Sequence, residues 1–158
     1  MKKLLIAASL IMIAFVSNAQ TSKGTWLLGG DAGFQSVKVD GGGSTSTWNL
    51  APSMGYFLAD NIAVRLHVDV SDNGAGTESY FGPALRYYFT SIGSNAKLFG
   101  DAGATFGDNY MMIGAKAGAA FFLNNSIALE TALAYGNETK SKTTSIGLNV
   151  GFQIHLGK

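Results

Sequence analysis

The stretch IAVRLHVDV, residues 62–70, alternates between branched aliphatic and other side chains along its whole length. Successive side chains of a β-strand point to opposite faces of its sheet. One face of this strand would therefore be entirely apolar, while the other would carry Arg65, His67 and Asp69. The stretch predicts a β-strand that separates an apolar environment from a polar one.

The same period of two continues on both sides of this strand, and turn-forming residues interrupt it at intervals. Gly, Asn, Asp and Ser dominate these interruptions, which suit hairpin connections. No segment after Thr21 has the spacing of a long amphipathic helix. The sequence thus predicts an all-β domain, an antiparallel meander of eight strands. The predicted strands span residues 25–38, 47–58, 62–70, 79–89, 96–106, 110–123, 127–136 and 143–156.

Composition excludes several classes of protein. Hydrophobic residues make up 47% of the 158 residues and charged residues only 13%, and the chain has 21 glycines. These values are unlike those of a disordered chain, a collagen or a coiled coil, and the length suits one domain. The absence of cysteine excludes disulfides and thiolate chemistry. The net charge of +1 does not favour a nucleic-acid partner.

The first nineteen residues have the organisation of a secretory signal peptide. A positive start at Lys2 and Lys3 precedes an apolar run of 13 residues, and small residues follow at Ser17-Asn18-Ala19. The apolar run is shorter than the roughly 20 residues that a transmembrane helix needs. The sequence therefore predicts removal of residues 1–19, which leaves residues 20–158 as one exported β-barrel domain.

Charged side chains well inside the predicted strands all fall on the face opposite the apolar one. Four are positive and four are negative, the balance expected of charges confined together away from water. Glycines crowd the same face, and small residues suit the interior of a narrow barrel. The charged residues, here called the lumen network, are Asp31, Arg65, Asp69, Arg86, Lys97, Asp101, Lys116 and Glu130. The glycines are Gly29, Gly33, Gly55, Gly82, Gly103, Gly114, Gly118, Gly147 and Gly151.

Two structures share this alternation: a soluble barrel or sandwich with apolar residues inside, and a membrane barrel with apolar residues facing lipid. The glycines and the balanced charges favour an eight-stranded, up-and-down transmembrane β-barrel. Aromatic residues of the apolar face agree, because they form the two groups expected at the two membrane interfaces. The periplasmic group is Trp26, Tyr56, Tyr87, Phe89, Phe121 and Phe152, and the outer group is Phe34, Trp48, Phe81, Phe106 and Tyr135. The alternative is a soluble secreted barrel that binds a hydrophobic ligand.

Two short segments resemble a known family. Residues 52–63, PSMGYFLADNIA, look like the second strand, tight periplasmic turn and third-strand entry of small eight-stranded outer-membrane β-barrels of Gram-negative bacteria, such as the OmpA transmembrane domain and OmpX. The last strand, residues 149–156, is similar to the signal that such barrels present to their insertion machinery. The resemblance implies a multi-pass outer-membrane protein whose partners are membrane lipid and that machinery. The signal positions are Asn149, Gly151, Ile154 and Leu156.

Candidate chemistry is sparse. His67 lies mid-strand beside Arg65 and Asp69, whereas His155 lies near the end of the last strand, so the two histidines should lie at different depths. We therefore predict no catalytic, metal or cofactor site. The lumen network is expected to satisfy itself together with polar neighbours and to fill the barrel. Those neighbours are Tyr80, Tyr88, Gln35, Asn49, Asn149 and Gln153.

The predicted function is that of a non-enzymatic, monomeric outer-membrane barrel with a structural or surface-interaction role. If the ion pairs exchanged partners, the barrel would instead be a small-conductance pore. A membrane enzyme acting on lipid would need a histidine near the outer rim, where none is predicted.

Two prolines lie within predicted strands. Pro52 and Pro83 each remove one ladder hydrogen bond, and a closed barrel has no free edge to accommodate them. Local β-bulges are expected at both positions.

Overall fold

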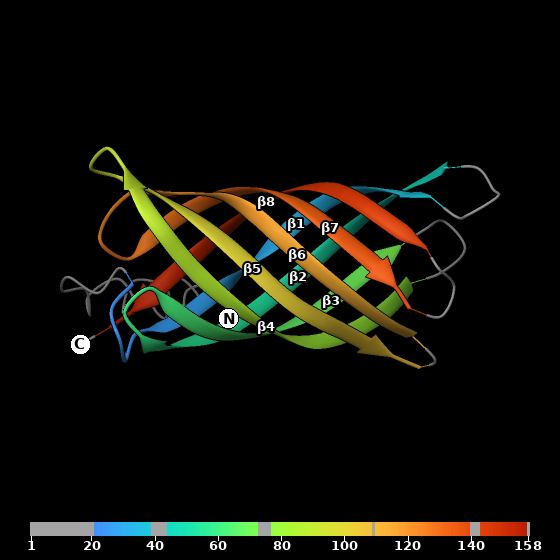
Figure 1. Cartoon of the computed structure of the whole chain (residues 1–158), viewed down its shortest axis with the longest axis horizontal. Coiled ribbons are helices and arrows are strands. Elements are labelled where there is room, and N and C mark those ends of the chain that lie inside the picture. Colours follow the sequence, from blue (N-terminus) through green and yellow to red (C-terminus); the bar gives the residue numbers. More distant parts are fainter. Residues whose placement is uncertain (1–20, 39–43, 73–76, 109, 140–142, 158) are drawn as a thin grey trace, which may run out of the picture.

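A computed structural model describes residues 21–38, 44–72, 77–108, 110–139 and 143–157. The described chain forms eight strands that close into one barrel, and every strand pairs antiparallel with its neighbours in sequence (Figure 1). The barrel closes where the last strand pairs with the first. The strands are β1 (Trp26–Lys38), β2 (Ser44–Ala59), β3 (Ile62–Asp72), β4 (Thr77–Ile92), β5 (Ala96–Gly107), β6 (Tyr110–Phe122), β7 (Ile127–Glu138) and β8 (Thr144–Leu156).

The predicted fold class is confirmed, and no strand end differs from its predicted position by more than three residues. The predicted signal peptide, residues 1–19, lies outside the described residues. In the part of the chain that the structure describes, no helix is long and apolar enough to cross a membrane.

The barrel has two distinct ends. One end, here called the terminal end, holds the start of β1, the end of β8 and the connections β2–β3, β4–β5 and β6–β7. The opposite end, here called the loop end, holds the ends of β1, β3, β5 and β7 and the starts of β2, β4, β6 and β8, and it lies at the right of Figure 1.

Apolar side chains cover the outside of the barrel. Large hydrophobic residues on every strand except β5 are between 41% and 65% exposed, including Leu66 at 58% and Leu148 at 54%. Arg65, Arg86 and Asp101 are buried inside. This arrangement reverses that of a soluble barrel with an apolar interior, so the alternative of a soluble ligand-binding barrel is wrong. The apolar exterior instead suits contact with lipid.

The two aromatic groups lie at opposite ends of the barrel, as predicted. At the terminal end, Trp26 packs edge-on against Tyr56, with ring centroids 5.0 Å apart. At the loop end, Phe81 packs against Phe106, with centroids 6.2 Å apart. Aromatic residues at both rims of the apolar band are typical of membrane barrels.

The expectation of bulges at the two prolines is wrong. The register of β2 on β3 is the same on both sides of Pro52, and the register of β4 on β3 continues through Pro83. Both prolines are exposed. Pro52 pairs with Gly30 of β1 and interrupts the ladder only toward β3, whereas Pro83 pairs with Leu66 of β3 and interrupts the ladder only toward β5. On the interrupted side, proline has no N–H to donate. The register shifts occur elsewhere, between Phe57 and Ala59 and between Tyr88 and Thr90, both near the terminal end.

Candidate functional site: the barrel interior

A buried ion-pair cluster occupies the middle of the barrel. The Arg86 guanidinium donates to both Asp101 carboxylate oxygens, from Nε to Oδ1 at 2.7 Å and from Nη2 to Oδ2 at 2.9 Å. Its Nη1 donates to Glu130 Oε1 at 2.6 Å. Arg65 Nη1 donates to Asp101 Oδ2 at 2.6 Å. These contacts join β3, β4, β5 and β7 through one set of side chains, so the cluster crosses the lumen.

Aromatic rings enclose this cluster toward the terminal end. The Arg86 guanidinium carbon lies 4.0 Å from the centroid of the Phe99 ring, which suits a cation–π contact. Arg86 also donates to the Tyr88 hydroxyl at 3.2 Å. Arg86 has no exposed surface, and its charge is balanced by two carboxylates in a place from which water is excluded.

A second ion pair lies outside the cluster. Lys116 Nζ on β6 donates to Asp31 Oδ2 on β1 at 2.7 Å. The side chain of Asp31 is only 7% exposed, whereas that of Lys116 is 27% exposed. Six members of the lumen network therefore meet a residue of opposite charge, as predicted.

Lys97 and Asp69 do not follow the prediction. Lys97 Nζ donates to Thr21 Oγ1 at 2.6 Å, and Asn61 Oδ1 lies 3.5 Å away. Asp69 accepts a hydrogen bond from Asn49 Nδ2 at 2.7 Å, and the His67 imidazole lies 3.9 Å away. Lys97 lies near the terminal end and Asp69 near the loop end, so these two opposite charges balance in number without meeting.

The segment before β1 contributes to the terminal end of the interior. Asn61 N donates to the Thr21 carbonyl at 2.7 Å, and Thr21 Oγ1 donates to Asn61 Oδ1 at 2.7 Å. Thr21 and Thr25 are buried. Because β1 and β5 are four strands apart in the closed order, the contact between Thr21 and Lys97 crosses the end of the barrel.

An apolar cluster fills the barrel interior near the terminal end. It contains Leu27, Phe57, Phe99 and Phe122, with Tyr88 and His155 packed among their rings. Tyr88 was expected in the lumen, but the four apolar residues were not. The signal was present, because each has the same strand parity as a lumen glycine or charge, such as Leu27 beside Gly29.

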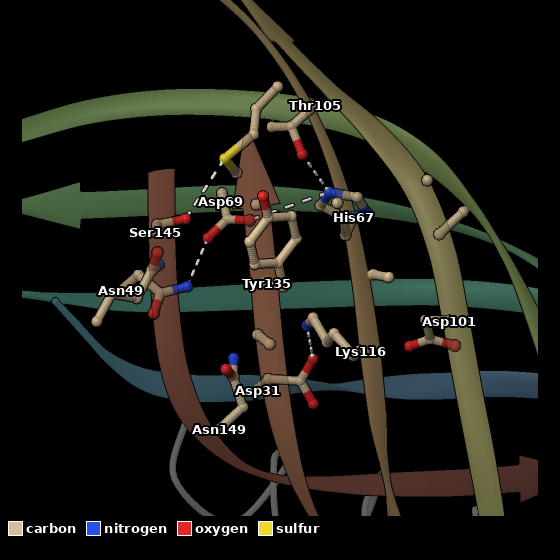
Figure 2. A pocket seen from close by; sticks show the side chains of 18 of the residues that line it. Asp31, Asn49, His67, Asp69, Asp101, Thr105, Lys116, Tyr135, Ser145 and Asn149 are labelled. Atoms are coloured by element: carbon tan, nitrogen blue, oxygen red, sulfur yellow. Dashed lines mark hydrogen bonds and ion pairs between the residues drawn. The ribbon is translucent and has the colours of Figure 1, made fainter. Parts of the chain in front are cut away.

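A cavity of about 90 Å³ lies between the central cluster and the loop end. Figure 2 shows Lys116 with Asp31 on one side of it and His67 with Asp69 and Thr105 on another. Asn49, Asn149 and Gln35 also line the cavity, whereas the predicted neighbour Tyr80 bonds to Glu78 instead.

The two histidines lie in different environments, as their spacing predicted. His155 is fully buried in the apolar cluster, and His67 lines the cavity. The hydroxyl of Thr105 approaches His67 Nε2 to 3.1 Å, and Asp69 approaches the same nitrogen. A relay of the Ser-His-Asp type needs its two partners on different ring nitrogens, so this trio lacks that geometry. Among the described residues, no three His, Asp or Glu side chains converge to hold a metal.

The predicted insertion-signal positions all lie on β8. Asn149 is buried in the interior, and Ile154 pairs with Leu28 of β1 and with Ile127 of β7. The strand therefore closes the barrel. The insertion role of Asn149, Gly151, Ile154 and Leu156 stays a prediction.

A polar, charged lumen inside an apolar, aromatic-rimmed exterior defines a small eight-stranded transmembrane β-barrel. The chain belongs to the outer membrane protein β-barrel domain family, whose model matches residues 5–158. A sequence comparison with curated proteins finds no match.

Several solved barrels share the fold at low sequence identity. Neisserial surface protein A has a TM-score of 0.70 and 15% identity, and the match covers 84% of this chain and 99% of that one. Ail, the attachment invasion locus protein of Yersinia pestis, has a TM-score of 0.61 and 14% identity over 84% and 99% of the two chains. The N-terminal barrel of Pseudomonas aeruginosa OprF has a TM-score of 0.56 and 14% identity over 84% and 98%. The family and these neighbours indicate an outer-membrane location.

Proposed function

We propose that the chain is a non-enzymatic, integral outer-membrane barrel with a structural or surface-interaction role and a lumen closed to ions. The observation that carries the proposal is the buried cluster around Arg86, which links four strands across the lumen. The Thr21 segment and the apolar cluster support closure at the terminal end. An eight-stranded barrel is just wide enough for its own side chains.

Conductance tests the closed lumen. Purified protein inserted into a planar bilayer should give no discrete current steps above the lipid background. Steady steps from the wild type would contradict closure and favour a small-conductance pore. Gel electrophoresis of the same sample with and without boiling verifies that the protein tested is a folded barrel.

The absence of catalysis rests on the interior geometry. The rings of Phe57, Tyr88 and Phe122 enclose His155. Thr105 and Asp69 both approach the same nitrogen of His67, Nε2. Neither arrangement supports a nucleophile and base pair at the outer rim. Lipid extracted from cells with and without the protein should have the same acyl-chain composition, and an altered composition would contradict this part of the proposal.

A surface-interaction role draws support from the neighbours. Ail carries the name attachment invasion locus protein, and one of its structures is a complex with the heparin analogue sucrose octasulfate. By analogy, the loop end of this barrel is the surface that faces outward. Exchange of the β1–β2 and β7–β8 connections for short turns should leave the barrel folded and heat-modifiable but abolish binding of intact cells to a host surface. Unchanged binding would contradict the surface-interaction role and favour the structural one.

Export and assembly complete the proposal. We infer that residues 1–19 are removed, that β8 is read by the barrel insertion machinery, and that the mature protein is a monomer surrounded by lipid, with no nucleic-acid partner and no cofactor. Amino-terminal sequencing of outer-membrane material should begin at Gln20. Substitution of Leu156 by Asp should lower the amount of folded protein in the outer membrane, and cross-linking in membranes should give one species of monomer mass.

A further inference from the structure

Asp69 differs from the other carboxylates in the barrel interior. Asp31, Asp101 and Glu130 each contact a lysine or arginine. Asp69 accepts a hydrogen bond from the Asn49 amide and lies 3.9 Å from the His67 imidazole, and among the described residues no lysine or arginine forms an ion pair with it. An unprotonated imidazole carries no charge, so the carboxylate of Asp69 has no fixed counter-charge.

The charge that would balance Asp69 lies at the other end of the lumen. Lys97 is the one cation of the lumen network without a carboxylate partner, and it is held by Thr21 and Asn61 near the terminal end. The Arg86 cluster lies between the two. The Asp69 side chain is 20% exposed, so its charge is only partly shielded by water and a small cation from solution can reach it.

The surroundings of Asp69 offer room and further oxygen ligands. Asp69 lines the cavity, which at about 90 Å³ can hold several water-sized groups. Asn49 and Asn149 line the same cavity, and each is 4% exposed. The Oδ1 atom of each has no hydrogen-bond partner within the described structure. Thr105 adds a hydroxyl beside His67.

We propose that this cavity binds a small monovalent cation, either an alkali-metal ion or a primary ammonium group, with Asp69 as its counter-charge. Carboxylate, amide and hydroxyl oxygens are the ligands that hard cations prefer, and they also accept hydrogen bonds from an ammonium group. One unbalanced negative charge matches one positive charge. A divalent ion would need more carboxylates, and among the described residues no three acidic or histidine side chains are arranged to hold a metal ion together.

The test compares thermal unfolding of the full mature barrel in detergent at pH 8, where a free imidazole is neutral. Potassium chloride, methylammonium chloride and tetraethylammonium chloride are used at equal ionic strength, the last being too bulky for the cavity. A ligand that binds only the folded state raises the unfolding midpoint. The midpoint should be higher in potassium or in methylammonium than in tetraethylammonium, and the effective salt identifies the kind of cation.

Variants locate the effect. Asp69→Asn should abolish the difference between salts, whereas Glu78→Gln, which removes a carboxylate at the loop-end rim outside the cavity lining, should preserve it. Because the difference between salts is the quantity read, an overall change in stability does not obscure the result. If Asp69→Asn does not fold, Asn149→Ala takes its place and should need up to about tenfold more cation for the same shift. Equal wild-type midpoints in all three salts, or a difference that survives in Asp69→Asn, would overturn the proposal.

Discussion

Arg86 and Asp101 face each other through two parallel hydrogen bonds inside the barrel, at 2.7 and 2.9 Å. Arg65 approaches the same carboxylate from β3. One aspartate therefore balances two guanidinium groups, of which Arg86 shares its charge with Glu130. The cluster contains two guanidinium groups and two carboxylates, so the loss of Asp101 leaves one buried positive charge unbalanced and breaks both of its ion pairs.

Asp101→Asn should lower the free energy of unfolding by about 3–5 kcal/mol, the range seen when one partner of a buried ion pair is removed. The measurement is urea unfolding of the refolded barrel in detergent, followed by gel mobility without boiling. Asp108→Asn is the matched control, because Asp108 is exposed at the loop end. Its effect should stay within about 0.5 kcal/mol. Equal effects of the two variants would mean that the cluster is hydrated and contributes little.

Lipid contact at the middle of the barrel gives a second prediction. Leu66 is 58% exposed and lies at the centre of β3, so Leu66→Arg should cost about 2–4 kcal/mol in a bilayer. Leu123 is 65% exposed but follows the end of β6 at the membrane interface, where an arginine costs only about 0–1 kcal/mol. Urea unfolding in lipid vesicles measures both. Similar costs at the two positions would contradict the assigned depth of the apolar band.

Sequence alternation predicted the faces of the strands but not the depth of each residue in the barrel. The parity of Arg65, Asp101 and Lys116 places them in the lumen, and the structure agrees. Parity contains no information on strand stagger, which decides which charges lie at the same height. The equal count of charges thus suggested a complete set of pairs, whereas Lys97 and Asp69 lie at opposite ends.

Two other features depended on contacts that periodicity does not encode. The Thr21 segment precedes the first predicted strand, and its role depends on a lysine four strands away. Local β-bulges were expected at the two prolines. Pro52 and Pro83 instead each lose pairing with one neighbouring strand only, and the register continues past both residues.

Asn61, in the turn between β2 and β3, has both a left-handed backbone and side-chain hydrogen bonds, and two substitutions distinguish the contributions of the two to stability. Asn61 has φ of +65°, a left-handed conformation that glycine adopts freely and alanine does not. Asn61→Gly should lose only the contacts with Thr21 and Lys97, at a cost of about 0.5–1.5 kcal/mol. Asn61→Ala should cost about 1 kcal/mol more, because strain is added. Urea midpoints of the two variants measure the difference, and a more stable alanine variant would contradict the assigned conformation.

Gly33 allows the packing of the cavity wall to be tested. A Cβ at this position would clash with Asn49 Oδ1 and would lie 2.9 Å from Asn149 Nδ2, so the absence of a side chain lets both amides approach β1. Gly33→Ala should destabilise the barrel by about 1–3 kcal/mol through overpacking. If the closest contact is responsible, adding Asn49→Ala should recover part of that loss, so that the double variant is more stable than the sum of the two single effects. The single Asn49→Ala variant is the control that completes this cycle of urea unfolding measurements. Strict additivity would show that Gly33→Ala acts through the backbone of β1, and that the amides do not depend on the glycine for their position.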